Sequence, residues 1–166
     1  MATVWQTGRG KMGPLAPLIG AWRADAETPM GPVACLRAFA PILGGKFVQL
    51  DAEWQFRAGE QATLRAYRER AVFGPDQDGV LAFWSFTSDG KRSQGRLADG
   101  SEIHEKALCF EARMTAGLAR QAYFPKGEDS MGWRVEAQTK KGWRVLSQHL
   151  YTRVDASAAD PAADKP

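Results

Sequence analysis

The chain has 166 residues, is 44% hydrophobic and 25% charged, and carries a formal net charge of +3 at pH 7. That length fits one domain of ordinary size, and the composition excludes both a disordered chain and a membrane-embedded one. Its 22 Lys and Arg residues are scattered, without a run of five or more, so no compact phosphate-binding surface and no nucleic-acid partner are predicted.

The N-terminus has no feature of a secretory signal or of a nucleotide-binding loop. Residues 1–13 lack a continuous apolar stretch. Gly8, Gly10 and Gly13 match the spacing G-x-G-x-x-G, but prolines follow at once and leave no room for a strand–turn–helix unit. We therefore expect a flexible leader over residues 1–13. No run of 18 apolar residues occurs, so the sequence predicts a cytoplasmic protein without a membrane partner.

The rest of the chain predicts one short helix followed by strands. The helix is expected over residues 14–19, where Pro14 suits the first helical position. Beyond it, short runs of Val, Leu, Phe, Trp and Tyr alternate with breaks such as Asp89-Gly90, which suit tight hairpins. This density of breaks predicts about ten strands joined mostly by hairpins, in an all-β, antiparallel sandwich or barrel.

Two strands show a clear apolar face with a period of two residues. The apolar positions of the first are Val48, Leu50, Ala52, Trp54 and Phe56. Those of the second are Met131, Trp133, Val135 and Ala137. Residues 80–86 are apolar on both faces, as in a strand covered on two sides, and residues 113–122 are assigned to strand. Residues 155–166 lack large apolar side chains and are expected to be a disordered tail, which leaves 14–154 as the domain.

The ends of the predicted sheet suggest that it closes on itself. Trp22 lies at the start of the first strand and Arg153 at the end of the last, so their side chains can meet only in a barrel. An arginine over an indole face gives a cation–π contact worth about 1 kcal/mol. We expect this structural pair to plug the closed end.

Three short segments resemble the calycin superfamily, which contains lipocalins, fatty-acid-binding proteins and nitrobindins. They are LIGAW at residues 18–22, LGGKF at 43–47 and YTR at 151–153. Within that group they are most similar to an uncharacterised bacterial lipocalin-like family of unknown function. The resemblance spans residues 14–154 and implies an up-and-down β-barrel with a ligand site in its interior.

The leading hypothesis is that the barrel binds a small hydrophobic or amphipathic molecule. Small residues on inward positions and polar residues such as Glu69 on apolar strands favour a cavity over a filled interior. Aromatic side chains would supply apolar area, and His149 and Tyr151 a polar anchor. The candidate lining residues are Trp54, Phe56, Tyr67, Trp84, His149 and Tyr151.

Three alternatives stay open. Nitrobindins bind haem through a histidine on the last strand, so the resemblance also implies haem ligation by His149, although Gln148 replaces the proline typical of that motif. An enzyme could draw acid–base groups from Glu69, His104, His149 and Tyr151, although no spacing requires it. A filled barrel would be an interaction module that self-associates, for example as a homodimer, through an exposed apolar patch.

Neither a metal site nor a disulfide is predicted. Two histidines exclude a three-histidine centre, and no C-x-x-C spacing occurs. Cys35 and Cys109 are expected to be small core thiols.

Overall fold

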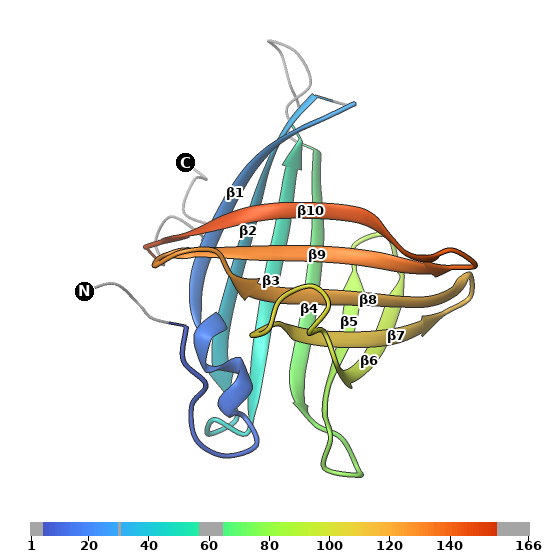
Figure 1. Ribbon diagram of the computed structural model, residues 1–166. Coiled ribbons are helices and arrows are strands. Elements are labelled where there is room, and N and C mark those ends of the chain that lie inside the picture. Colours follow the sequence, from blue (N-terminus) through green and yellow to red (C-terminus); the bar gives the residue numbers. More distant parts are fainter. Residues whose placement is uncertain (1–4, 30, 57–64, 156–166) are drawn as a thin grey trace.

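The computed structural model describes residues 5–29, 31–56 and 65–155, and the structural statements below concern those residues. They form one short 3-10 helix and ten strands (Figure 1). The elements are η1 (Gly13–Leu18), β1 (Gly20–Thr28), β2 (Gly31–Ile42), β3 (Phe47–Phe56), β4 (Arg65–Pro75), β5 (Leu81–Thr87), β6 (Arg92–Ala98), β7 (Leu108–Met114), β8 (Gly117–Pro125), β9 (Ser130–Thr139) and β10 (Gly142–Val154).

The strands form a closed antiparallel barrel in which each strand pairs with its neighbours in sequence. The ring closes between β1 and β10, where Trp22 is the register partner of Arg153. In Figure 1 the strands β1 to β4 run across the direction of β8, β9 and β10. The predicted all-β, up-and-down barrel of about ten strands with a short N-terminal helix is confirmed.

Helix η1 lies at one end of the barrel, beside the start of β1 (Figure 1). Part of the expected leader packs with it: Trp5 and Met12 contact the core, and the Gly8 amide donates to the Gly13 carbonyl over 2.9 Å. A Cβ on Gly13 would collide with the Gly8 backbone. The three glycines therefore belong to a tight turn before the helix, and residues 5–12 belong to the fold.

The apolar faces that the alternation predicts point into the barrel and form its core. Val48, Leu50 and Ala52 of β3 are buried, and Trp54 and Phe56 pack against the same core. Both cysteines are buried thiols, with Cys35 in the main core.

One strand prediction needs correction. Residues 113–122 are not one strand, because β7 ends at Met114 and β8 begins at Gly117. Gly117 has φ +125°, which side-chain-bearing residues rarely adopt, so a hairpin turn interrupts the segment.

Outside the barrel wall, the segment between β6 and β7 covers a second, small apolar cluster. Cys109, Ala122 and Phe124 are buried there, with Ile103 and Ala107 packed on them. Within the described ranges, no helix has the length and apolar character needed to cross a lipid bilayer. Of the tail expected over 155–166, only Asp155 falls within the described residues.

Candidate functional site

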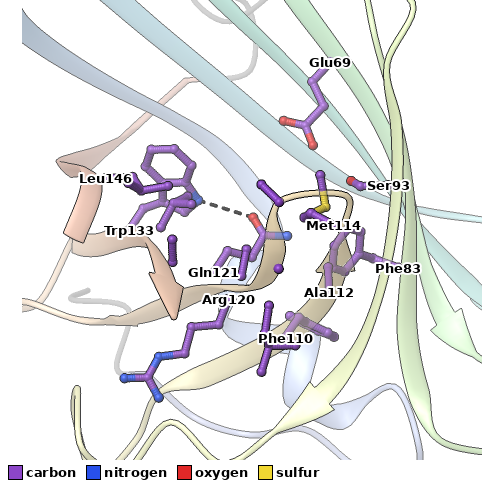
Figure 2. Close-up of a pocket in the computed structure, with 16 residues that line it drawn as sticks. Glu69, Phe83, Ser93, Phe110, Ala112, Met114, Arg120, Gln121, Trp133 and Leu146 are labelled. Atoms are coloured by element: carbon purple, nitrogen blue, oxygen red, sulfur yellow. Dashed lines mark hydrogen bonds between the residues drawn. The ribbon is translucent and has the colours of Figure 1, made fainter. Parts of the chain in front are cut away.

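The barrel interior contains a cavity of about 430 Å³ that is open on one side, where its lining includes the exposed Met114 and Leu146 and the turn between β7 and β8. This volume lies in the range of small-molecule sites. Its wall is mostly apolar, and a row of short side chains on the adjacent strands β7, β8 and β9, namely Ala112, Ala119 and Ala137, leaves the space. Figure 2 shows the Glu69 carboxylate pointing into this space, whereas the Arg120 guanidinium extends away from it. The lining side chains include Glu69, Phe83, Ser93, Phe110, Ala112, Met114, Gln121, Trp133, Val135 and Leu146.

A buried arginine lies next to the cavity. Arg37 on β2 is 1% exposed and points to the inside of the barrel. Its Nη1 donates to the Tyr123 hydroxyl over 2.8 Å, and its Nε donates to the Tyr151 hydroxyl over 3.2 Å. Its Nη2 has no hydrogen-bond partner among the described residues.

Four aromatic rings surround this guanidinium. The Arg37 Cζ atom lies 4.4 Å from the centroid of the Trp133 ring, which also lines the cavity. The remaining three, Trp54, Tyr123 and Tyr151, have centroids 5.4, 5.7 and 5.7 Å away. Cation–π attraction is strongest when the cation is out of water, so the rings partly compensate for the lost hydration.

Electrostatics keep Arg37 charged. Burial alone would lower the pKa of Arg37, but the two tyrosine hydroxyls and the Glu69 carboxylate outweigh it and raise the pKa. Burial raises the pKa of Tyr123 and of Tyr151, although the Arg37 charge acts in the opposite direction, so both hydroxyls stay protonated.

Glu69 on β4 is the counter-ion of Arg37 and belongs to the cavity wall. Its Oε2 lies 4.0 Å from Arg37 Nη2, and its side chain is 15% exposed. Its Oε1 accepts a 2.7 Å hydrogen bond from the Ser85 hydroxyl. The cavity therefore has an apolar wall with one buried ion pair at its edge.

Four of the six predicted lining residues lie around Arg37 and its aromatic neighbours rather than on the cavity wall. Trp54 and Tyr151 contact Arg37, and Tyr67 packs on Trp54 with ring centroids 5.4 Å apart. The Tyr67 hydroxyl donates a long, exposed hydrogen bond of 3.5 Å to the Asp89 carboxylate. His149 stacks on Trp133 at 5.5 Å and nearly parallel.

Two predicted lining residues lie elsewhere. Phe56 is partly buried at the edge of the core. Trp84 lies on the outer face of β5, because it alternates with Phe83, which lines the cavity, and with the buried Ser85. A strand that is apolar on both faces gives no indication of which residues point inward.

Sequence reasoning missed the centre of the site. Arg37, Tyr123 and Gln121 were not among its candidates. The sequence does contain an indication for Arg37. It is the only charged residue in the apolar run of residues 33–39, and it lies on the same face of the strand as Cys35 and Phe39. A lone arginine on the core face of a strand is seldom buried without partners.

The geometry around His149 does not fit haem ligation in this cavity. His149 is not on the cavity wall, its ring lies flat against Trp133, and its Nε2 is 3.4 Å from the Ser147 hydroxyl. Burial and then the Arg37 charge lower the pKa of His149, which keeps the ring neutral. The other histidine, His104, stacks on Phe124 outside the barrel wall, remote from the acid–base set considered with it.

The two structural residues come together at the end of the barrel. Arg153 Cζ lies 4.1 Å from the centroid of the Trp22 indole. Gly20 has φ +124°, and a Cβ on it would collide with the Arg153 guanidinium. The backbone conformation therefore favours glycine two residues before the tryptophan, and a larger residue there would displace the Arg153 guanidinium.

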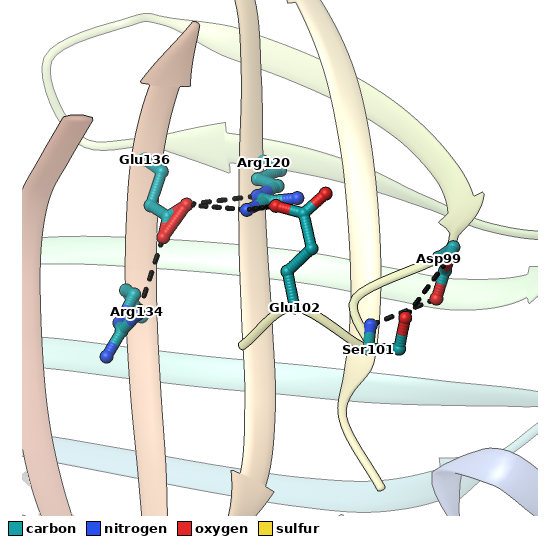
Figure 3. A network of polar contacts seen from close by, with 6 residues as sticks. All are labelled: Asp99, Ser101, Glu102, Arg120, Arg134 and Glu136. Carbon is teal, nitrogen blue, oxygen red and sulfur yellow. Dashed lines mark hydrogen bonds and ion pairs between the residues drawn. The ribbon is translucent and has the colours of Figure 1, made fainter. Parts of the chain in front are cut away.

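A second buried ion pair lies on the outer face of the barrel (Figure 3). Arg120 on β8 pairs with Glu136 on β9 over 2.9 Å, and both side chains are almost fully buried. Glu102, from the segment that covers the outer cluster, approaches Arg120 to 3.4 Å, and Trp143 lies under the guanidinium at 4.1 Å. Arg120 and Glu136 thus pair with each other, and Glu102 adds a contact between the covering segment and the wall.

Comparisons with known proteins do not identify a family for this chain. No family model matches the chain, and no curated protein matches it. Among solved structures it is similar to a de novo designed fluorescence-activating β-barrel, with 13% sequence identity and a TM-score of 0.39, over 82% of this chain and 93% of that one. The resemblance to calycins stays a prediction from the sequence.

Proposed function

We propose that this protein binds a small, largely apolar molecule inside the barrel, in the manner of a calycin-like carrier. The observation that carries the proposal is the unfilled interior: a cavity of about 430 Å³ with aromatic and aliphatic walls and a few polar groups. Such a combination is usual for small-molecule sites, in which apolar area supplies affinity and a few polar groups set orientation.

The interior is a better candidate than the larger groove of about 700 Å³ that runs over the outer face of β2, β3 and β4. Charged side chains in that groove already pair with each other, as Arg70 does with Asp51 over 2.8 Å. Buried polar atoms without a hydrogen-bond partner among the residues described occur at both places, Glu53 Oε2 in the groove and Arg37 Nη2 beside the interior cavity. The Glu53 oxygen has the exposed Arg68 guanidinium 3.6 Å away, whereas Arg37 Nη2 is a buried donor 4.0 Å from Glu69 Oε2, and a buried donor of this kind favours a ligand that supplies an acceptor.

Titration with a neutral fluorescent probe, N-phenyl-1-naphthylamine, tests the proposal. We expect saturable binding at one site and a blue-shifted emission. The Ala137→Phe variant adds a ring to the cavity wall and should weaken binding at least about tenfold. The matched control is Ala66→Phe, which adds the same ring at an exposed position of β4 and should bind as the wild type does.

Two results would overturn the proposal. One is a wild-type protein that does not bind the probe. The other is equal binding by both phenylalanine variants, because the probe would then sit outside the cavity. Native mass spectrometry of freshly purified protein, with extraction of any bound molecule, would identify the physiological ligand directly.

A further inference from the structure

At the edge of the cavity, one hydrogen-bond donor and one acceptor face each other without bonding. Arg37 donates from Nε to Tyr151 and from Nη1 to Tyr123, and its Nη2 has no hydrogen-bond partner in the described parts of the chain. Nη2 lies 4.0 Å from Glu69 Oε2, which is beyond hydrogen-bond distance. A polar contact of this length suits a third group that bonds to both sides.

Glu69 is the accessible half of this pair. Its Oε1 is held by Ser85 over 2.7 Å, while Oε2 is free to accept a second bond on the cavity side. Arg37 is buried and is not itself on the cavity wall, and Glu69 is the lining residue whose carboxylate lies 4.0 Å from its Nη2, so a ligand head group would approach Nη2 beside Glu69. The apolar wall formed by Phe83, Phe110 and Trp133 continues from this point and accommodates a hydrocarbon tail.

The charges of the pair restrict the head group. A carboxylate head would be repelled by Glu69, and an ammonium head by Arg37, and either would have to leave water for a site whose charges already balance. A hydroxyl or a primary amide carries both a donor and an acceptor without net charge. One oxygen about 2.9 Å from each group satisfies both and spans the gap.

We propose that the cavity selects an uncharged amphipathic molecule, an apolar tail ending in a hydroxyl or primary amide that accepts from Arg37 Nη2 and donates to Glu69 Oε2. This assignment rests on the proposed function and specifies its ligand class. The rings around Arg37 hold the guanidinium in place, so the donor is oriented before the ligand arrives.

A series of four decyl compounds tests the head group by displacement of N-phenyl-1-naphthylamine at pH 7. They are decan-1-ol, decyl methyl ether, decanoate and decylammonium. The ether accepts a hydrogen bond but cannot donate one, so it separates the role of Glu69 from that of Arg37. Decan-1-ol should displace the probe at a concentration at least about tenfold lower than either ion, and about fivefold lower than the ether.

The Glu69→Gln variant should change this order. Removing the carboxylate leaves the Arg37 charge unbalanced. The displacing concentration of decanoate should therefore fall, relative to that of decan-1-ol, by at least about tenfold. The matched control is Glu111→Gln on β7, whose side chain alternates with the inward Phe110 and Ala112 and so faces outward. It should keep the wild-type order.

Several outcomes would overturn the assignment: an ether that competes as well as the alcohol, an ion that competes best in the wild type, decyl compounds that do not displace the probe, or an order unchanged by Glu69→Gln. If that variant does not fold, the wild-type series alone decides. A probe that never binds, or that ignores Ala137→Phe, rejects the proposed function instead. If the probe binds and all four compounds displace it equally, only the assignment of the head group is rejected, and the proposed function stands.

Discussion

Arg153 and Trp22 together close the end of helix η1. The Arg153 guanidinium stacks on the Trp22 indole at 4.1 Å and donates to the carbonyls of Ile19 and Pro17 over 2.7 and 3.2 Å. The Trp22 Nε1 donates to the Leu18 carbonyl over 2.8 Å. Carbonyls at the end of a helix have no partner within it, so these two side chains satisfy the groups that the helix leaves open.

The Arg153→Met variant should therefore be less stable by about 2 kcal/mol, because it loses the cation–π contact and leaves two carbonyls without their donors. Urea unfolding followed by tryptophan fluorescence measures this loss. The control is Arg144→Met, an exposed arginine on the same strand, which should unfold at nearly the wild-type midpoint. Equal midpoints for the two variants would contradict the structural role of Arg153.

The hydroxyl of Tyr123 should matter more than that of Tyr67. Tyr123→Phe removes the acceptor of a 2.8 Å bond from the buried Arg37 and should lower the free energy of unfolding by about 1–3 kcal/mol. Tyr67→Phe removes only a long, exposed contact with Asp89, so we expect little change. Chemical denaturation of both variants measures the two changes in the free energy of unfolding. A larger loss of stability in Tyr67→Phe would contradict the role of the buried network.

Removing one partner of the outer ion pair should destabilise the fold much more than removing one partner of a surface pair. Arg120→Met leaves the Glu136 carboxylate buried without its main partner and should cost about 3 kcal/mol. Arg96→Met removes an exposed arginine that pairs with Asp76 and Asp78, and the loss should be much smaller. Thermal unfolding of the two variants provides the comparison. Similar losses would show that Arg120 is not a buried anchor.

His149 should make stability depend on pH. Burial and the Arg37 charge keep the pKa of His149 below its ordinary value in the folded protein. The unfolded chain therefore takes up the proton first, so this part of the stability is present above about pH 6.5 and is lost as the pH falls from there through the lower pKa of the folded protein.

The His149→Gln variant should lose less stability than the wild type between pH 7.5 and pH 5. Urea unfolding at both pH values measures the two losses. Carboxylates contribute equally to both proteins, so the difference isolates His149. Parallel pH profiles would show that the ring protonates as easily in the folded state as in the unfolded one.

Much of the barrel could be predicted because its signals are local. Alternation with a period of two depends only on the strand, and it placed Val48 and Leu50 inside. Breaks such as Asp89-Gly90 depend only on backbone preference and separated the strands. The pairing of Trp22 with Arg153 could be predicted because a closed sheet brings the first and last strands together.

The site was less predictable because its members meet only across the closed barrel. The hydroxyls bound to Arg37 come from Tyr123 and Tyr151, on strands far away in sequence. A register shift between Val145 and Ser147 changes which face of β10 points inward, and parity alone cannot place it.

The sequence by itself determined the strand number, the antiparallel order and the apolar faces, because these follow from local spacing and turn residues. Only the tertiary structure decided that the interior holds a cavity and that Glu69 and Arg37 meet at its edge. The physical reason is that volume and charge pairing inside a barrel depend on how distant strands align when the sheet closes.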